Sequence, residues 1–458
     1  MFILMVVVFV LGYLAIALEH PLKVDKAASA LIIGTLCWVV YVIGAEDILA
    51  LGFSPSWEAF SQAHSGNLLE LVPEFIAEFE IVHHLGEIAE ILFFLLGAMT
   101  IVEVVDQHDG FKIITDKIKT TNKIKLLWIL SFLTFFMSTL LDNLTTTIVL
   151  VALLRKLVDD KETRWFFASM VVLAANAGGA WSPIGDVTTI MLWIGGQVTA
   201  GAIISRVVLP SLVCMAVPLI IISFTMKGKV QRPQFNDDED ELTTQFEQVF
   251  MLILGVAGLL FVPLFKTITH LPPYMGMLLS LGVIWAVSEI MHKNKPDDIK
   301  YQLSVTGILK RVDVPTVLFF LGILSAVAAL QSAGHLHLLS GYLDEKLGNV
   351  FLIDLAIGLL SSIVDNVPLV AGAMGMYPVA DVGVGGYFSS FVQDGAFWEF
   401  LAYTAGTGGS ILIIGSAAGV AAMGLERIDF LWYLKKISLL ALAGYLAGAG
   451  TYYLMFGL

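Results

Sequence analysis

The sequence predicts an all-α membrane protein of about ten crossings, built as an inverted-topology repeat with two re-entrant hairpins and two discontinuous helices. Composition is the first reason: 57% of the 458 residues are hydrophobic and 14% are charged, whereas soluble domains carry about 25% charged residues. Apolar runs long enough to span a bilayer also recur along the whole chain. Finally, the order of elements in residues 1–226 returns in 248–458, after a polar linker at 227–247.

Composition and charge narrow the function classes. The net charge of −14 comes largely from acidic residues in 45–84 and 237–241, and it argues against a nucleic-acid partner. The two cysteines, Cys37 and Cys214, lie within apolar runs, so neither a disulfide framework nor a zinc site is expected. The sequence has no phosphate-binding glycine loop, metal cluster or nucleophile motif, and we expect no enzyme and no cofactor. The expected partners are membrane lipid and small inorganic cations.

The first half is predicted to hold three spans, a hairpin, a broken helix and a last span. The ranges are, in this order, 2–18, 27–44, 85–105, 124–158, 165–198 and 202–226. The first run has no basic segment and no cleavage site, so we expect a retained helix and not a signal peptide. Residues 109–119 carry apolar residues at helical spacing and predict an interfacial amphipathic helix.

Two of these elements are irregular. Asp142 divides 124–158 into arms that are slightly short for two full spans, so a re-entrant hairpin covered by protein is favoured. The run 165–198 is too long for one span. It is interrupted by three glycines and one proline within 176–186, which breaks a helix at mid-membrane.

The second half repeats this order. Its predicted elements are spans at 248–265, 272–291 and 314–333, an amphipathic segment at 335–347, a hairpin at 350–378, a broken helix at 396–424 and a final span at 430–457. Aligning Gly178 with Gly408 also places Gly185 on Gly415 and Asp186 on Ser416, without a gap. Each half then crosses the membrane an odd number of times, which forces opposite orientations and predicts an inverted repeat.

The distribution of basic residues predicts the orientation. If the loop 45–84, which lacks Lys and Arg, lies outside, then all but three of the 25 basic residues fall on the cytoplasmic side. The exceptions are Arg206, Lys266 and Lys346. Such a bias predicts a multi-pass protein of the cell (inner) membrane with both termini on the outer, periplasmic side.

The predicted site lies where the hairpin tips meet the helix breaks. Each tip places a Ser four residues before an Asp-Asn pair, and an intramembrane carboxylate costs about 2.5–3.5 kcal/mol on insertion scales, which suggests a function. Oxygen ligands with net negative charge suit a small hard cation, since these stretches contain no Lys or Arg. The predicted cation- or proton-binding residues are Ser138, Asp142, Asn143, Thr145, Asn176, Asp186, Thr188, Thr189, Ser361, Asp365, Asn366, Thr407 and Ser410, with Na⁺ expected in the region of Asp142 and Asp365.

A buried carboxyl group also suggests a mechanism for exchange. Burial raises the pKa of a carboxyl group from about 3.9 towards neutrality. The same group then binds either a proton or a cation, and the two compete.

Other interpretations stay open at several positions. Each of the three aspartates could instead cap a helix end, as Asp186 would for the second half of its broken helix. His83, Glu87 and Glu90 share one helix face, and they form either a pH sensor or a solvated face at the membrane edge.

Several motifs together resemble those of NhaD-type sodium/proton antiporters. These antiporters belong to the ion transporter superfamily, with the citrate, dicarboxylate and arsenite carriers. The similar stretches are 19–26, 138–147, 176–189, 365–370 and 405–423, within a resemblance that covers nearly the whole chain. The resemblance implies a secondary transporter that exchanges Na⁺, and also Li⁺, for protons by alternating access and serves pH homeostasis. It further implies a homodimer with an elevator-like transport unit of hairpins and broken helices.

The tips also separate this sequence from relatives with other substrates. Sodium-coupled dicarboxylate carriers of the superfamily carry Ser-Asn-Thr at each tip, whereas here Asp142-Asn143 and Asp365-Asn366 replace it. The replacement favours cation transport. The alternative is an anion, arsenite or dicarboxylate-type carrier in which the aspartates conduct only coupling ions, and a passive channel ranks third.

Overall fold

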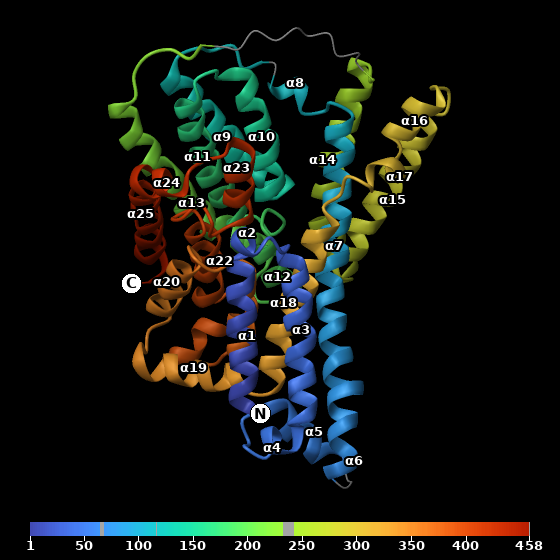
Figure 1. The fold of residues 1–458 in the computed structure, drawn as a ribbon, viewed down its shortest axis with the longest axis vertical. Coiled ribbons are helices and arrows are strands. Elements are labelled where there is room, and N and C mark those ends of the chain that lie inside the picture. Colours follow the sequence, from blue (N-terminus) through green and yellow to red (C-terminus); the bar gives the residue numbers. More distant parts are fainter. Residues whose placement is uncertain (65–67, 116, 232–241, 458) are drawn as a thin grey trace.

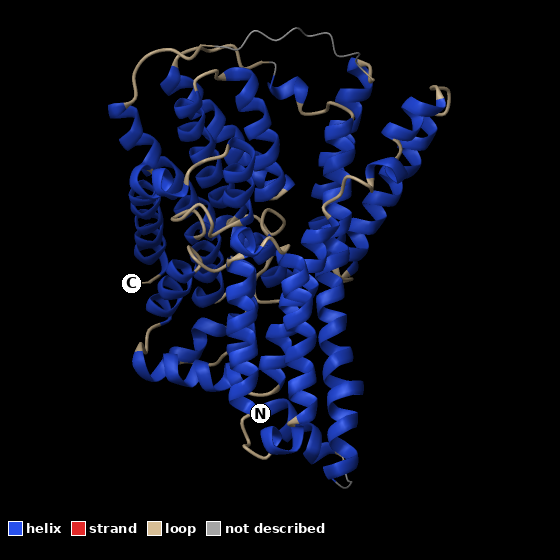
Figure 2. Ribbon diagram, viewed as in Figure 1, coloured by secondary structure: helices blue, strands red, loops and turns tan. Residues whose placement is uncertain are grey.

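The computed structural model describes residues 1–64, 68–115, 117–231 and 242–457. Within these ranges the regular elements are all helical, with two isolated β-bridges and no named strand (Figure 2). Eight helices of the described chain are long and apolar enough to cross a membrane. The all-helical, polytopic character expected from the sequence is therefore confirmed. Most of the predicted linker, including the acidic run 237–241, lies outside the described residues.

The helices follow one another along the chain as labelled in Figure 1. The N-terminal half contains α1 (Phe2–Ala17), α2 (Glu19–Leu22), α3 (Lys26–Ile43), α4 (Ala45–Leu49), α5 (Pro55–Ala63), α6 (Leu68–Glu74), the π-helix η1 (Phe75–Glu80), α7 (Ile81–Gln107), α8 (Lys112–Thr115), α9 (Lys123–Leu141), α10 (Asn143–Leu157), α11 (Lys161–Gly179), α12 (Val187–Ile194) and α13 (Ala200–Thr225). The C-terminal half contains α14 (Gln245–Thr269), α15 (Pro273–Met291), α16 (Asp297–Leu303), α17 (Val305–Ile308), α18 (Val314–Ser332), α19 (His335–Lys346), α20 (Val350–Leu360), α21 (Asn366–Met376), the 3₁₀-helix η2 (Gly386–Phe391), α22 (Ala396–Gly408), α23 (Ala417–Glu426), α24 (Phe430–Lys436) and α25 (Ser438–Phe456).

One group of helices is built around α3, α7 and α18. Helix α3 packs against α1 and α18, while α7 packs against α14, α15 and α18. Figure 1 shows α7 running along much of the long axis of the molecule. A Cβ atom on Gly34 would overlap the backbone of Gly322, and one on Gly322 would overlap Ala30. These two glycines therefore let the backbones of α3 and α18 touch.

The second group contains the helices that carry the predicted site. Helix α13 packs against α25, α20 against α22, and α11 against α9 and α10. Buried Glu426, at the end of α23, accepts hydrogen bonds from Arg155 at 2.7 Å and from Arg164 at 2.9 Å. Buried Glu399 of α22 pairs with Arg206 of α13 at 3.0 Å and accepts from Tyr452 of α25 at 2.8 Å. Charge-assisted bonds thus join helices that are far apart in sequence.

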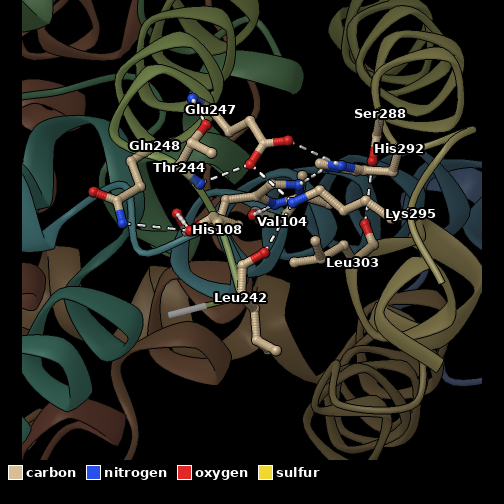
Figure 3. Close-up of polar contacts among 11 residues, drawn as sticks. Val104, His108, Leu242, Thr244, Glu247, Gln248, Ser288, His292, Lys295 and Leu303 are labelled. Carbon is tan, nitrogen blue, oxygen red and sulfur yellow. Dashed lines mark hydrogen bonds and ion pairs between the residues drawn. The ribbon is translucent and has the colours of Figure 1, made fainter. Parts of the chain in front are cut away.

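A buried histidine pair joins the ends of α7 and α15 near the start of α14 (Figure 3). The Nε2 atoms of His108 and His292 lie 2.8 Å apart, and Nδ1 of His108 lies 2.6 Å from the carbonyl oxygen of Val104. Lys295 donates to Glu247 at 2.8 Å. Burial lowers the pKa of His292 to about 4, with repulsion from His108 and Lys295 acting in the same direction and Glu247 opposing it. Two neutral rings can make both contacts if His108 Nδ1 donates to the carbonyl oxygen of Val104 and His108 Nε2 accepts from His292 Nε2.

Three boundaries differ from the sequence-based expectation. The span predicted at 85–105 is part of a continuous helical stretch from Leu71 to Gln107 that includes η1, and the predicted loop before it contains α4, α5 and α6. The aromatic rings of Trp57 and Phe60 pack on Phe75, which explains why this acidic segment folds. The predicted interfacial helix is reduced to the four residues of α8.

The last difference is at the C-terminal end. The final span, predicted at 430–457, is divided at Ile437 into α24 and α25. Asp429 caps α24 by accepting from the backbone of Trp432 at 2.8 Å, and the segment ends at Lys435 and Lys436. Cations favour the C-terminal turn of a helix, so a stop at this point agrees with the local sequence.

Candidate functional site

Both tip aspartates begin a helix. Asp142 accepts hydrogen bonds from the backbone N–H and the hydroxyl of Thr145, each at 2.8 Å, and so caps α10. Asp365 caps α21 by accepting from Val367 at 3.1 Å, and its own N–H donates to the hydroxyl of Tyr13 at 2.9 Å. The capping interpretation is therefore correct for both residues. Capping uses only some of the lone pairs of a carboxylate and leaves others for a cation.

The backbone of Asp142 is strained. Its φ of 66° and ψ of 161° place a non-glycine residue in a region that is used almost only by glycine. Such a conformation costs on the order of 1–3 kcal/mol and persists where the surroundings impose it. This strain marks the first tip as a place where position matters more than local stability.

The two broken helices are interrupted at matching positions. Helix α11 ends at Gly179 and α12 begins after Asp186, while α22 ends at Gly408 and α23 begins after Ser416. Asp186 caps α12 by accepting from the N–H and hydroxyl of Thr188, each at 2.9 Å. Ser416 caps α23 through the N–H of Gly419 at 3.1 Å.

Glycines let each tip approach one of these breaks. A Cβ atom on Gly185 would lie 2.6 Å from the carbonyl oxygen of Ser138. A Cβ atom on Gly415 would lie 2.6 Å from the carbonyl oxygen of Ser361. Real Cβ atoms do not approach this closely. Glycine is therefore required where the first tip meets the first break and where the second tip meets the second.

One buried hydrogen-bond network joins both tips and both breaks. Asp186 is 1% exposed, and its Oδ2 accepts from Nδ2 of Asn143 at 2.6 Å. Nδ2 of Asn366 lies 3.4 Å from both carboxylate oxygens of Asp186. Oδ1 of Asn176 also accepts from Asn143, at 3.0 Å. Nδ2 of Asn176 donates to the hydroxyl of Ser410 at 2.8 Å and to that of Ser416 at 2.9 Å.

The network is electrostatically negative. Asp186 interacts with the charges of both Asp142 and Asp365. Lys26, at the start of α3, is the one basic residue whose attraction for Asp365 counts in the described structure, and it reaches the site from outside the predicted stretches. The aspartates face the N-terminal ends of α10, α12 and α21, where the helix dipole stabilises negative charge. The carboxylate of Asp186, which both Asp142 and Asp365 repel, is therefore held among neutral amides and hydroxyls.

Several predicted residues lie beside the network and bond elsewhere. The hydroxyls of Ser138 and Ser361 donate to the carbonyl oxygens of Ala175 and Ala405, at 2.6 and 2.9 Å, and so tie each tip to a broken helix. Thr189 donates to the carbonyl oxygen of Asp186 at 2.9 Å, and Thr407 donates to that of Tyr403 at 2.6 Å. These hydroxyl oxygens remain acceptors. Among the described residues no group of three or more His, Cys, Asp or Glu side chains is arranged to hold a metal ion.

Three residues of the site were not among the predicted ligands. Ser416 joins the network directly, and the alignment of Asp186 with Ser416 was the available signal. Tyr13 and Lys26 reach Asp365 from α1 and α3, over separations of more than 300 residues. Local sequence pattern carries no information about such contacts.

A cavity of about 380 Å³ lies between α7, α12, α18 and α21. Its lining includes Glu87 and Glu90. The third predicted member of that face, His83, is exposed and lies 3.4 Å from Glu87. The lining histidine is instead its neighbour His84, which is buried and lies 3.5 Å from Glu80 and 3.2 Å from Glu87. The i, i+4 spacing of Glu80 and His84 was the missed signal.

The C-terminal end of α12 borders the same cavity and is capped from the first group of helices. Lys266 of α14 donates to the carbonyl oxygen of Trp193 at 2.8 Å, and its Nζ lies 4.7 Å from the centre of the Trp193 ring. Glu90 attracts the same ammonium group. A cation at a helix C-terminus is favourable, so this contact stabilises the C-terminal end of α12.

Comparisons with known proteins place these features in context. A profile of the citrate transporter family matches residues 2–390. Sodium/proton antiporter 1 of Arabidopsis thaliana is 46% identical over 450 residues, which cover 98% of this chain and 71% of that protein. Sodium/proton antiporter 2 of the same plant is 42% identical over 453 residues, covering 98% of each. The Na⁺/H⁺ antiporter NhaD of Alkalimonas amylolytica is 29% identical over 474 residues, covering 98% and 89%.

Proposed function

Because this chain belongs to the citrate transporter family, and to the NhaD-type sodium/proton antiporters within it, we propose that it exchanges Na⁺, and also Li⁺, for protons across a membrane. The protein is a transporter and not an enzyme. The observation that carries the proposal is the buried Asp186, whose carboxylate receives amide hydrogen bonds from both tips. A Na⁺ ion would replace these amide hydrogens and coordinate the amide and hydroxyl oxygens of the network.

Protons and cations compete in this mechanism. Asp142 and Asp365 each repel Asp186 when these acids are charged. Either a proton or a Na⁺ ion relieves this repulsion, and one excludes the other. Binding of Na⁺ on one side therefore releases protons there, and release of Na⁺ on the opposite side allows protons to bind. This competition couples the two fluxes without a further device.

Alternating access requires an inward-open and an outward-open conformation, and an inverted repeat would supply both. We propose that α9–α10 and α20–α21 are re-entrant hairpins and that residues 1–226 and 248–458 are inverted repeats. The matching caps at Asp186 and Ser416, and the matching serine contacts to Ala175 and Ala405, support this assignment. The second helix group would then move as an elevator-like unit against the first.

The cellular setting follows from the same reasoning. We expect both termini on the periplasmic side of the inner membrane, because the basic residues gather on the opposite side. The resemblance to NhaD-type antiporters further implies a homodimer. His84, Glu87 and Glu90 line a cavity that would then open towards the periplasm. We propose that this group, with the exposed His83 beside Glu87, senses external pH.

The family description raises a second candidate, a carrier for an anion such as citrate, and the superfamily resemblance adds a neutral oxyacid such as arsenite. The site opposes this reading. A carboxylate substrate would meet three aspartates, and Lys26 is already attracted to Asp365. Uptake of citrate or arsenite that is driven by Na⁺ or protons, with no Na⁺- or Li⁺-driven proton movement when that substrate is absent, would establish this alternative.

One assay tests the exchange directly. Purified protein is placed in vesicles that contain a pH-sensitive dye, and Na⁺, Li⁺ or K⁺ is added at several pH values. We expect Na⁺-driven proton movement whose apparent KM for Na⁺ rises by up to about tenfold for each unit of acidification, because protons occupy the same carboxylates. Asp142→Asn and Asp365→Asn should abolish it. A KM that does not change with pH, with transport intact, would place protons and Na⁺ at separate sites.

A further inference from the structure

Asp354 is a buried acid that the mechanism above does not use. It lies in α20, the helix that leads to the second tip, and its side chain is 0% exposed. Neither carboxyl oxygen has a hydrogen-bond partner among the described residues. No described cation forms an ion pair with it, which sets it apart from Glu399 and Glu426, two buried acids that are paired with arginines.

The residues around Asp354 are aromatic, and their hydroxyl groups already donate hydrogen bonds to other acceptors. Four tyrosines, Tyr377, Tyr387, Tyr445 and Tyr452, interact with it electrostatically. Their hydroxyl hydrogens go elsewhere. Tyr377 and Tyr387 donate to Asp344, Tyr445 to the carbonyl oxygen of Leu355, and Tyr452 to Glu399. None of these phenol groups donates a hydrogen bond to Asp354 in the described structure, so they offer nothing to a carboxylate. A charged Asp354 would have no compensation for its lost hydration, which costs several kcal/mol.

The repeat shows that the acid is not needed for packing. Asp354 lies eleven residues before Asp365, and Ser131 lies eleven residues before Asp142. Ser131 is also buried, at 1% exposure, and its hydroxyl likewise has no partner in the described structure. The first half therefore has a small group without charge where the second half has an ionisable one. The difference adds a proton-binding group to one half only.

A polar route leads from this acid to the edge of the structure. Asp344 of α19 is half-buried and accepts from Tyr377 at 2.9 Å and from Tyr387 at 2.6 Å. Tyr377 thus donates to Asp344 and lies within electrostatic range of Asp354, to which it makes no hydrogen bond in the described structure. A hydroxyl group that can donate and accept is the kind of group that passes a proton between two carboxyls.

We propose that Asp354 carries one proton across the membrane in each cycle, in addition to the protons displaced by Na⁺ at the tips. This rests on the proposed Na⁺/H⁺ exchange. When α20 reaches one side and the carboxylate is hydrated, a proton adds to form the O–H bond. On the other side the carboxyl group is hydrated again, that bond breaks, and water takes the proton towards Tyr377 and Asp344. No oxidation or other bond change is involved.

The balance point of exchange tests the proposal. Vesicles that contain the protein are held at zero membrane potential with a pH difference of one unit. We then measure the Na⁺ concentration ratio across the membrane at which the protein moves no net Na⁺ or protons. Each coupled proton contributes a factor of about ten to that gradient, since one pH unit is about 1.4 kcal/mol per proton. We expect Asp354→Asn and Asp354→Ser to lower the balancing gradient tenfold, and the matched variant Ser131→Ala to leave it unchanged. An unchanged gradient in both Asp354 variants would overturn the proposal.

A second measurement covers the case in which the Asp354 variants do not transport. The infrared band of a protonated carboxyl group is followed in the purified wild-type protein and in Asp354→Asn, with and without Na⁺, over a range of pH. We expect a band that is lost in the variant and that responds to pH in the wild type. A band absent from the wild type, or one that never responds, would overturn the proposal. If the wild type shows no Na⁺-dependent proton flux at all, the proposed function fails instead, whatever Asp354 does.

Discussion

At Asp186, amide groups of Asn143 and Asn366 converge from the two tips on one carboxylate. Each amide turns its hydrogen towards the acid, and its oxygen would face a bound cation. A single side chain, at the first break, therefore contacts both tips. The tip acids Asp142 and Asp365 bond to their own helices and influence Asp186 through their charge.

We expect Asp186→Asn to abolish exchange while the protein remains folded. An amide still caps α12, but it has no negative charge and cannot take up or release a proton. Sodium-driven dye response in vesicles and the thermal unfolding midpoint are the two measurements. Asp429→Asn is the matched control, because Asp429 only caps α24, and it should keep full exchange. Exchange at the wild-type rate in Asp186→Asn would remove this residue from the site.

The site residues could be predicted from sequence to the extent that they are local. Tip motifs, glycine-rich breaks and the gapless alignment of Asp186 with Ser416 all lie within short segments. The long-range neighbours of Asp365 could not be predicted, because Tyr13 and Lys26 reach it from α1 and α3. His84 was missed because the i, i+4, i+7 face that contains His83 was chosen without knowing which side of α7 is covered.

Between elements, glycines set how closely helices approach. A Cβ atom on Gly178 would overlap the backbone of Phe135 in α9, and one on Gly408 would overlap the backbone of Gly358 in α20. The two contacts occupy matching places in the two halves. Each broken helix is thus seated against an arm of a tip with no side chain between them.

Replacing either glycine with alanine should destabilise the protein by about 1–3 kcal/mol, because backbone atoms cannot move aside as a flexible side chain can. The thermal unfolding midpoint of Gly178→Ala and Gly408→Ala measures this. Gly424→Ala in α23 is the control, since its added Cβ meets nothing within 4 Å, and alanine there should stabilise the helix by about 0.5–1 kcal/mol. Equal midpoints in all three variants would contradict the close packing.

The histidine pair predicts how acid affects the ends of α7 and α15. The pKa of buried His292 is lowered to about 4, whereas an unfolded histidine titrates near about 6.5. Between these values the unfolded chain binds more protons, so stability is highest above about pH 6.5 and falls as the pH is lowered towards 4. The unfolding midpoint of His292→Gln should fall less between pH 7 and pH 5 than that of the wild type. His337→Gln, which alters an exposed ring, should follow the wild type, and identical losses in all three proteins would exclude His292 as the cause.

For the whole molecule, orientation is the property on which the direction of each pathway depends. A cysteine at Gln62, near the end of α5, should react with an impermeant thiol reagent added outside cells, and one at Thr121 only after the membrane is opened. Both positions are exposed, whereas native Cys37 and Cys214 are buried and give little background. The reverse pattern would invert the topology and exchange the sides to which the two tips open.

Element order across the whole chain was predictable because hydrophobic runs of membrane length are unmistakable, and the all-helical architecture followed from them. Boundaries were less predictable. The segment before α7 looked like an acidic loop, yet packing of the Trp57 and Phe60 rings against Phe75, edge-on and tilted, holds it in helices. The division at Ile437 likewise depends on local caps that hydropathy does not register.

The pairing of Asp186 in one half with Ser416 in the other has a consequence for how the transporter would respond to ions on its two faces. If the proposed inverted halves were identical, the inward- and outward-open forms would be related by a two-fold rotation and would have equal free energy. The halves differ at their centre, so we expect the two forms to be unequally populated, and apparent affinity scales with the fraction of the competent form. The Na⁺ concentration for half-maximal flux should therefore differ between the faces. Equilibrium requires the maximal rates in the two directions to differ by a compensating factor, so the protein would be tuned to the ion concentrations of one compartment.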